Sequence, residues 1–155
     1  MPVLPSIRLF DLDLVSASRT QAIDALLAQP RARVAFVNAH CVNVAMTDPT
    51  YRRALHSADM LLPDGAGLEL AARMHGAQFQ DNLNGTDLGP DLARALAWRG
   101  LSLFLLGGRP GVAERAATRL QNLAPGLEIA GTCDGYDGLR DARATIDAVN
   151  ASGAD

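Results

Sequence analysis

The stretch LSLFLLGGRP, residues 101–110, contains the strongest structural signal in the chain. Its first six residues form an almost continuous apolar run, which is typical of a strand buried on both faces of a parallel sheet. Two glycines and an arginine follow, and Pro110 suits the first turn of a helix. The stretch therefore predicts a buried strand, a glycine-rich turn and a helix, the repeating unit of α/β folds.

The same order of elements recurs along the rest of the chain. The apolar patterns predict strands at residues 7–15, 32–37, 58–63, 101–106 and 127–132. The predicted helices run from the Ser18–Gln21 capping box to Pro30, over 40–57 with a break near Asp48-Pro49, and over 67–74, 90–98, 110–124 and 140–151. Strands that alternate with amphipathic helices indicate an α/β fold with a mostly parallel sheet and helices on both faces. Since no repeat or linker interrupts the pattern, residues 1–155 are expected to form a single domain.

Composition narrows the class of protein. The chain has 155 residues, of which 48% are apolar and 20% are charged, as in soluble globular domains. No apolar run approaches the roughly 18 residues of a membrane span. The N-terminus does not have the pattern of a secretory signal. Two cysteines and three histidines without metal-ligand spacing predict no metal site and a reducing, cytoplasmic location.

The charges restrict the chemistry further. The net charge is −3, which does not favour nucleic-acid binding, and all 14 basic residues are arginine. The absence of lysine excludes Schiff-base chemistry and a P-loop lysine. Phosphate groups must therefore be recognised by arginine, backbone N–H groups or helix N-termini.

Polar clusters follow most of the predicted strands, where ligands bind in open α/β sheets. Four follow strands and a fifth precedes a helix: Asn38-Ala39-His40, Pro63-Asp64-Gly65, Gly107-Gly108-Arg109-Pro110, Asp134-Gly135-Tyr136 and Asn84-Gly85-Thr86-Asp87. We expect their members to converge on one edge of the sheet and to form a substrate site.

Each cluster also has a structural interpretation. Asp64 is either a general base or a turn and capping residue. Asn38 either binds a sugar hydroxyl or phosphate or caps a helix, and Asp87 suits a helix start. The turn at 107–110 either approaches a phosphate, with Arg109 adding charge, or only connects strand and helix. Tyr136 either stacks on a base or sugar or anchors its loop.

The ordered motifs resemble the WecG/TagA/CpsF glycosyltransferases. The resemblance covers roughly residues 30–155, through VNAHCVNVAMTDPTYRRALHSADMLLPDGAGLELAARMHG, then NGTDL, then LFLLGGRPGVAERAATRLQNLAPGLEIAGTCDGY. It implies a Rossmann-like fold and inverting transfer of an N-acetylhexosamine, typically N-acetylmannosamine, from a UDP-sugar. The implied acceptor is a polyprenyl-diphosphate-linked sugar of surface polysaccharide or teichoic-acid-type biosynthesis, with no cofactor or metal.

The resemblance also implies roles for single residues. Asp64 of the PDG motif matches the proposed catalytic base. The matching substrate-binding positions are Asn38, Gly65, Gly85, Thr86, Asp87, Gly107, Gly108, Arg109, Gly135 and Tyr136. Two positions depart from the common pattern. Phe36 stands where many members have threonine, and Asn82-Leu83-Asn84 occupies the stretch in which many have arginine.

The end of the sequence departs as well. Family members continue into another strand and a basic tail that is expected to complete the active site and meet the inner face of the cytoplasmic membrane. The chain is therefore expected to be truncated at its C-terminus, with an exposed sheet edge that favours homo-oligomers. The alternative function is a non-catalytic nucleotide-sugar-binding domain. A nucleotide-dependent oxidoreductase is disfavoured because no G-x-G-x-x-G is present.

Overall fold

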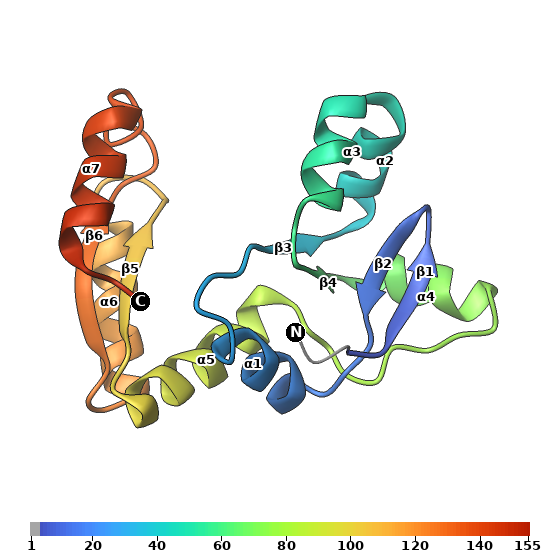
Figure 1. The fold of residues 1–155 in the computed structure, drawn as a ribbon, viewed down its shortest axis with the longest axis horizontal. Coiled ribbons are helices and arrows are strands. Elements are labelled where there is room, and N and C mark those ends of the chain that lie inside the picture. Colours follow the sequence, from blue (N-terminus) through green and yellow to red (C-terminus); the bar gives the residue numbers. More distant parts are fainter. Residues whose placement is uncertain (1–3) are drawn as a thin grey trace. The chain divides into compact units, whose positions relative to one another are not determined.

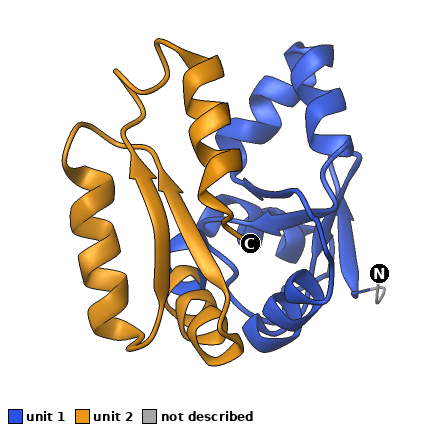
Figure 2. Ribbon diagram, turned by 60° about the vertical axis from the view of Figure 1, so that its left-hand side comes forward, with its two compact units in different colours: residues 1–88 blue, residues 89–155 orange. Residues whose placement is uncertain are grey.

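The computed structural model describes residues 4–155, which form two compact units. The first comprises residues 1–88 and the second residues 89–155 (Figure 2). Each unit has a sheet of its own. The expectation of a single domain stays a prediction, and the units are described one at a time.

The first unit has a four-stranded sheet. Its strands are β1 (Ser6–Leu9), β2 (Leu12–Val15), β3 (Val34–Val37) and β4 (Met60–Pro63), in the spatial order β1-β2-β4-β3 (Figure 1). β4 is parallel to both of its neighbours, and only β1 and β2 are antiparallel. The buried core of this unit includes Leu12, Leu14, Val37 and Leu62, each at most 1% exposed.

Four helices of the first unit follow from local capping signals. They are α1 (Arg19–Leu27), α2 (Ala39–Thr47), α3 (Pro49–His56) and α4 (Ala66–Met74). The Ser18–Gln21 capping box is present, as predicted. Asp48 separates α2 from α3 and accepts hydrogen bonds from the backbone of Thr50 and Tyr51, which confirms the predicted break.

The single strand predicted at residues 7–15 is wrong, because the structure has two strands and a turn there. Phe10 and Asp11 have φ angles of 52° and 63°. This left-handed pair suits the tight turn of a hairpin. The apolar alternation continues across the turn, so the pattern alone looks like one longer strand.

The second unit contains a two-stranded parallel sheet. Its elements are β5 (Ser102–Leu106), α6 (Val112–Leu123), β6 (Glu128–Cys133) and α7 (Ala142–Ser152), preceded by α5 (Gly85–Arg99), which begins in the first unit. β5 and β6 pair from Ser102↔Glu128 to Leu106↔Cys133. α6 and α7 lie on opposite faces of this pair (Figure 2).

Two predicted helices begin elsewhere than expected. α5 starts at Gly85 rather than at Pro90, because the Asn84 side chain accepts a hydrogen bond from the Asp87 backbone at 2.8 Å and caps the helix. α6 starts at Val112, after Gly111 in the left-handed conformation. The apolar spacing of Val112, Ala116, Leu120 and Leu123 predicts that these residues form the buried stripe of this helix. That prediction is wrong, because the buried positions are Ala113 and Ala117, and Val112 and Leu123 are exposed.

The predicted fold class is confirmed. The chain is α/β, its strand pairs are mostly parallel, and its alternation of strands and helices is Rossmann-like. Among the described residues, no helix is both long enough and apolar enough to cross a bilayer.

Candidate functional site

Asp64 and Asn38 lie at the carboxyl ends of neighbouring parallel strands. Val37 and Pro63 are register partners on β3 and β4. The backbone N–H of Asp64 donates a hydrogen bond to the Val37 carbonyl at 2.7 Å. This bond extends the strand pairing by one residue, so the chain enters both following turns at the same edge of the sheet. The clusters around Asn38 and Asp64 therefore lie at the same edge of this sheet, and the convergence of all five clusters stays a prediction.

The helices that follow these strands begin close together. A Cβ added at Gly67 would lie 3.1 Å from the Cβ of Ala39, so the first turns of α4 and α2 pack tightly. Asn38 caps α2 by accepting a hydrogen bond from the Cys41 backbone at 3.0 Å. Gly65, at φ 90°, caps α4 without a side-chain bond. Because helix N-termini carry partial positive charge, this edge favours an anion such as a diphosphate.

The start of α5 reaches the same part of the first unit through Phe36. A Cβ added at Gly85 would lie 3.6–3.7 Å from Cζ, Cε1 and Cε2 of the Phe36 ring. Phe36 is on β3, two residues before Asn38. The Gly85-Thr86-Asp87 cluster is therefore brought to the strand that leads to Asn38, and Thr86 and Asp87 occupy the exposed first turn of α5.

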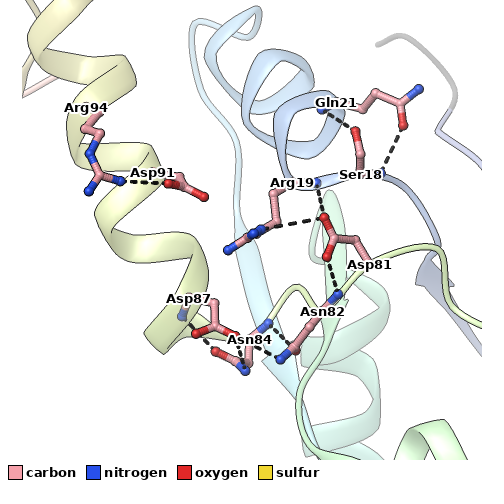
Figure 3. Close-up of polar contacts among 9 residues, drawn as sticks. All are labelled: Ser18, Arg19, Gln21, Asp81, Asn82, Asn84, Asp87, Asp91 and Arg94. Carbon is pink, nitrogen blue, oxygen red and sulfur yellow. Dashed lines mark hydrogen bonds and ion pairs between the residues drawn. The ribbon is translucent and has the colours of Figure 1, made fainter.

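Two asparagines that precede α5 hold the Asp87 carboxylate (Figure 3). Oδ2 of Asp87 accepts hydrogen bonds from Nδ2 of Asn82 at 2.9 Å and from Nδ2 of Asn84 at 3.2 Å. Asp81, the residue before Asn82, accepts a hydrogen bond from the Arg19 backbone N–H at 3.2 Å. Its carboxylate also faces the Arg19 guanidinium at 3.6 Å. The loop before α5 is thus tied to α1, and its asparagine amides donate hydrogen bonds to the Asp87 carboxylate.

The Asp64 carboxylate is available for chemistry. Within residues 4–155 it has no hydrogen-bond or ion-pair partner. Asp64 is partly buried, and the two residues before it, Leu62 and Pro63, are buried. A partly shielded carboxylate without a partner can accept a proton from a bound hydroxyl group.

A second cluster lies at the carboxyl ends of β5 and β6, in the second unit. The Gly107 N–H donates to the Cys133 carbonyl at 2.9 Å, and the Gly135 N–H donates to the Gly108 carbonyl at 2.8 Å. A Cβ added at Gly135 would lie 3.1 Å from the Gly107 Cα. The two glycine loops therefore touch through their backbones, which favours glycine at position 135, because a Cβ there would make the neighbouring backbone shift by a few tenths of an ångström.

Asp134 shapes the loop that carries Tyr136. Its Oδ1 accepts hydrogen bonds from the backbone N–H groups of Tyr136 at 2.9 Å, Asp137 at 2.7 Å and Gly138 at 3.3 Å. These bonds, led by that from Tyr136, lower the pKa of Asp134 below its ordinary value. The ordered loop leaves the Tyr136 side chain 63% exposed. Arg109, beside the other loop, is also exposed, and its guanidinium has no partner within residues 4–155.

The structure therefore groups the predicted site residues in two sets. The first unit holds Asn38, Asp64, Gly65, Gly85, Thr86 and Asp87, and the second holds Gly107, Gly108, Arg109, Gly135 and Tyr136. Phe36 and Asn82 had no predicted binding role, and Asn84 and Asp134 were predicted only as members of their polar clusters. The spacing N-x-N-G-x-D was the available signal for the two asparagines, since asparagine before a helix readily caps it. In the described part of the chain, no three His, Cys, Asp or Glu side chains gather as metal ligands would.

Among the known proteins to which this chain is similar, two share the name N-acetylglucosaminyldiphosphoundecaprenol N-acetyl-beta-D-mannosaminyltransferase. The protein from Bacillus spizizenii is 34% identical over 111 residues, which cover 72% of this chain and 42% of that protein. The protein from Bacillus subtilis is 28% identical over 103 residues, which cover 66% of this chain and 40% of that protein.

The matched region thus spans about two fifths of the length of these curated relatives. The model of the glycosyl transferase WecG/TagA/CpsF family matches residues 7–155, nearly the whole sequence. The matched range includes all the predicted site residues of the first and second units. The chain therefore belongs to the WecG/TagA/CpsF family of glycosyl transferases.

Proposed function

We propose that this chain carries the catalytic base and the donor site of an inverting glycosyltransferase. The enzyme would move an N-acetylhexosamine of the N-acetylmannosamine type from a UDP-sugar to a polyprenyl-diphosphate-linked sugar. The observation that carries the proposal is the free Asp64 carboxylate, which lies directly before the N-terminus of α4, where no side chain forms a capping hydrogen bond. The names of the two relatives support the choice of sugar and acceptor.

The proposed reaction follows from this arrangement. Asp64 removes the proton of the acceptor hydroxyl while its oxygen forms a bond to the anomeric carbon, on the face opposite UDP. The bond from this carbon to the diphosphate oxygen breaks, its electron pair leaves with UDP, and the configuration inverts. The N–H groups at the starts of α4 and α2 favour the negative charge that develops on the leaving diphosphate.

Taken by itself, the second unit also has features that suit a phosphate-containing ligand. Glycines at positions 107, 108 and 135 allow the backbone to approach a ligand closely, and Arg109 supplies a cation for a phosphate. The exposed Tyr136 ring offers a surface on which a base or a sugar can stack. No step of this reaction calls for a metal or a cofactor. The acceptor places the enzyme at the inner face of the cytoplasmic membrane, in the assembly of a surface polysaccharide.

Replacing the base tests the proposal directly. We expect Asp64→Asn to lower acceptor-dependent UDP release by about 10²–10⁴-fold, the usual contribution of a general base. The assay uses a panel of UDP-sugars with a polyprenyl-diphosphate-sugar analogue. Asparagine keeps the shape of the side chain, so the free energy of unfolding should not change.

A matched control separates this effect from a general loss of charge. Asp13 on β2 forms an ion pair with Arg8 at 2.8 Å and belongs to neither cluster. Asp13→Asn should leave UDP release unchanged. If the wild-type chain binds UDP-sugars without acceptor-dependent release, it is a nucleotide-sugar-binding domain. If Asp64→Asn is as active as wild type, Asp64 is not the base.

A further inference from the structure

Phe36 is an aromatic residue whose side chain is not buried in the core. It is 41% exposed, whereas Val37 beside it is fully buried. Its register partner on β4 is Leu62, and register partners of parallel strands project to the same face of a sheet. Continuing two residues along each strand leads to Asn38 and Asp64. Phe36 therefore lies on the sheet face that leads to the proposed catalytic edge.

Contacts within the protein cover only part of the Phe36 ring. Its outer edge faces Gly85, which has no side chain to cover it. Polar residues stand next to both partners in the sequence: Asn84 and Asp87, on either side of Gly85, are hydrogen-bonded to one another and to Asn82, and Asn38 follows Phe36 by two positions. An exposed ring that contacts the start of α5, close in sequence to amides and a carboxylate, combines apolar and polar groups as a small-molecule site does.

A sugar ring has matching chemistry. Its hydroxyl groups form hydrogen bonds with amides and carboxylates, and its C–H faces are apolar enough to pack on an aromatic ring. We propose that Phe36 is a specificity-determining residue that packs against the C–H face of a hexosamine ring during the transfer. The inference rests on the proposed function and deepens it. The sugar can belong to the donor or to the acceptor, and the test separates the two.

The test compares three ligands by isothermal titration calorimetry on the 155-residue chain. The ligands are UDP, UDP-N-acetylmannosamine and a short-chain polyprenyl-diphosphate N-acetylglucosamine. We expect Phe36→Ala to weaken binding of one sugar ligand about 3- to 10-fold, as for the loss of one aromatic contact. Binding of UDP alone should not change. Loss for the UDP-sugar assigns the donor ring to Phe36, and loss for the lipid-linked sugar assigns the acceptor ring.

Two further variants keep the test specific. Phe36→Tyr retains the ring and should bind both sugar ligands like wild type. Phe10→Ala removes a similarly exposed ring, 48% accessible on the β1–β2 turn, and should have no effect. Unchanged affinity of Phe36→Ala for both sugar ligands would overturn the inference. So would an equal loss for UDP and the sugar ligands, which would indicate a structural role. A wild-type chain that binds neither UDP nor a UDP-sugar would instead refute the proposed function, and the inference with it.

Discussion

At the scale of single residues, Gly135 is the contact between the two loops at the end of β5 and β6. A Cβ there would lie 3.1 Å from the Gly107 Cα and 3.2 Å from the Gly108 N, and neither backbone atom can rotate away. We expect Gly135→Ala to lower the free energy of unfolding by about 1–3 kcal/mol, as for other overpacked sites. It should also weaken UDP binding. Urea unfolding and calorimetry measure the two effects.

Gly89 provides the control for this prediction. It lies in α5, and a Cβ there would meet nothing within 4 Å. Gly89→Ala should raise the free energy of unfolding by about 0.5–1 kcal/mol, because alanine loses less backbone entropy in a helix. Equal behaviour of the two variants would contradict the close contact at Gly135.

At the scale of secondary structure, α1 depends on its capping box. The Ser18 hydroxyl accepts a hydrogen bond from the Gln21 backbone at 3.2 Å, and the Gln21 side chain accepts one from the Ser18 backbone at 2.9 Å. Ser18→Ala should lower the free energy of unfolding by about 1 kcal/mol. Thr118→Ala, within α6, should have no such cost, since its hydroxyl bonds only the Glu114 carbonyl of its own helix. If urea denaturation gives the two variants the same free energy of unfolding, the capping box does not stabilise α1.

A comparison of predicted and observed elements shows where local sequence patterns fail to predict the structure. Caps and helix breaks were predicted well, as at Ser18 and Asp48, because each depends on residues a few positions apart. The Phe10-Asp11 turn was not, because the alternation of apolar residues continues through it. The start of α5 at Gly85 was missed because two glycines and Pro90 favour a loop in isolation. The Asn84 cap and the buried Leu83 and Leu88 override that preference.

At the scale of the whole molecule, we expect low pH to destabilise the second unit, because two of its carboxylates become protonated. Backbone hydrogen bonds led by that of Tyr136 lower the pKa of Asp134. The Ser102 backbone N–H, and then its hydroxyl, lower the pKa of Asp155. A carboxyl whose folded pKa is below its unfolded value stabilises the fold at higher pH. This contribution is lost as the pH falls below the ordinary value of about 3.8 and through the folded pKa.

Amide exchange followed by NMR can measure this effect. Protection factors in β5 and β6 should fall between about pH 4 and pH 2. The double variant Asp134→Asn/Asp155→Asn should show a smaller dependence on pH over the same range. An equal fall in the variant and in wild type would show that these two carboxylates are not responsible.

The sequence by itself determined the α/β class, most helix and strand positions, and the residue types of both clusters. These depend on apolar periodicity, capping and turn chemistry, all of which act over a few neighbouring residues. Only the tertiary structure decided that Asp64 pairs with Val37, that Phe36 lies against Gly85, and that Gly135 touches Gly107. Each of these contacts joins segments that are distant in the chain. Their distances depend on strand order and backbone packing, which no local pattern specifies.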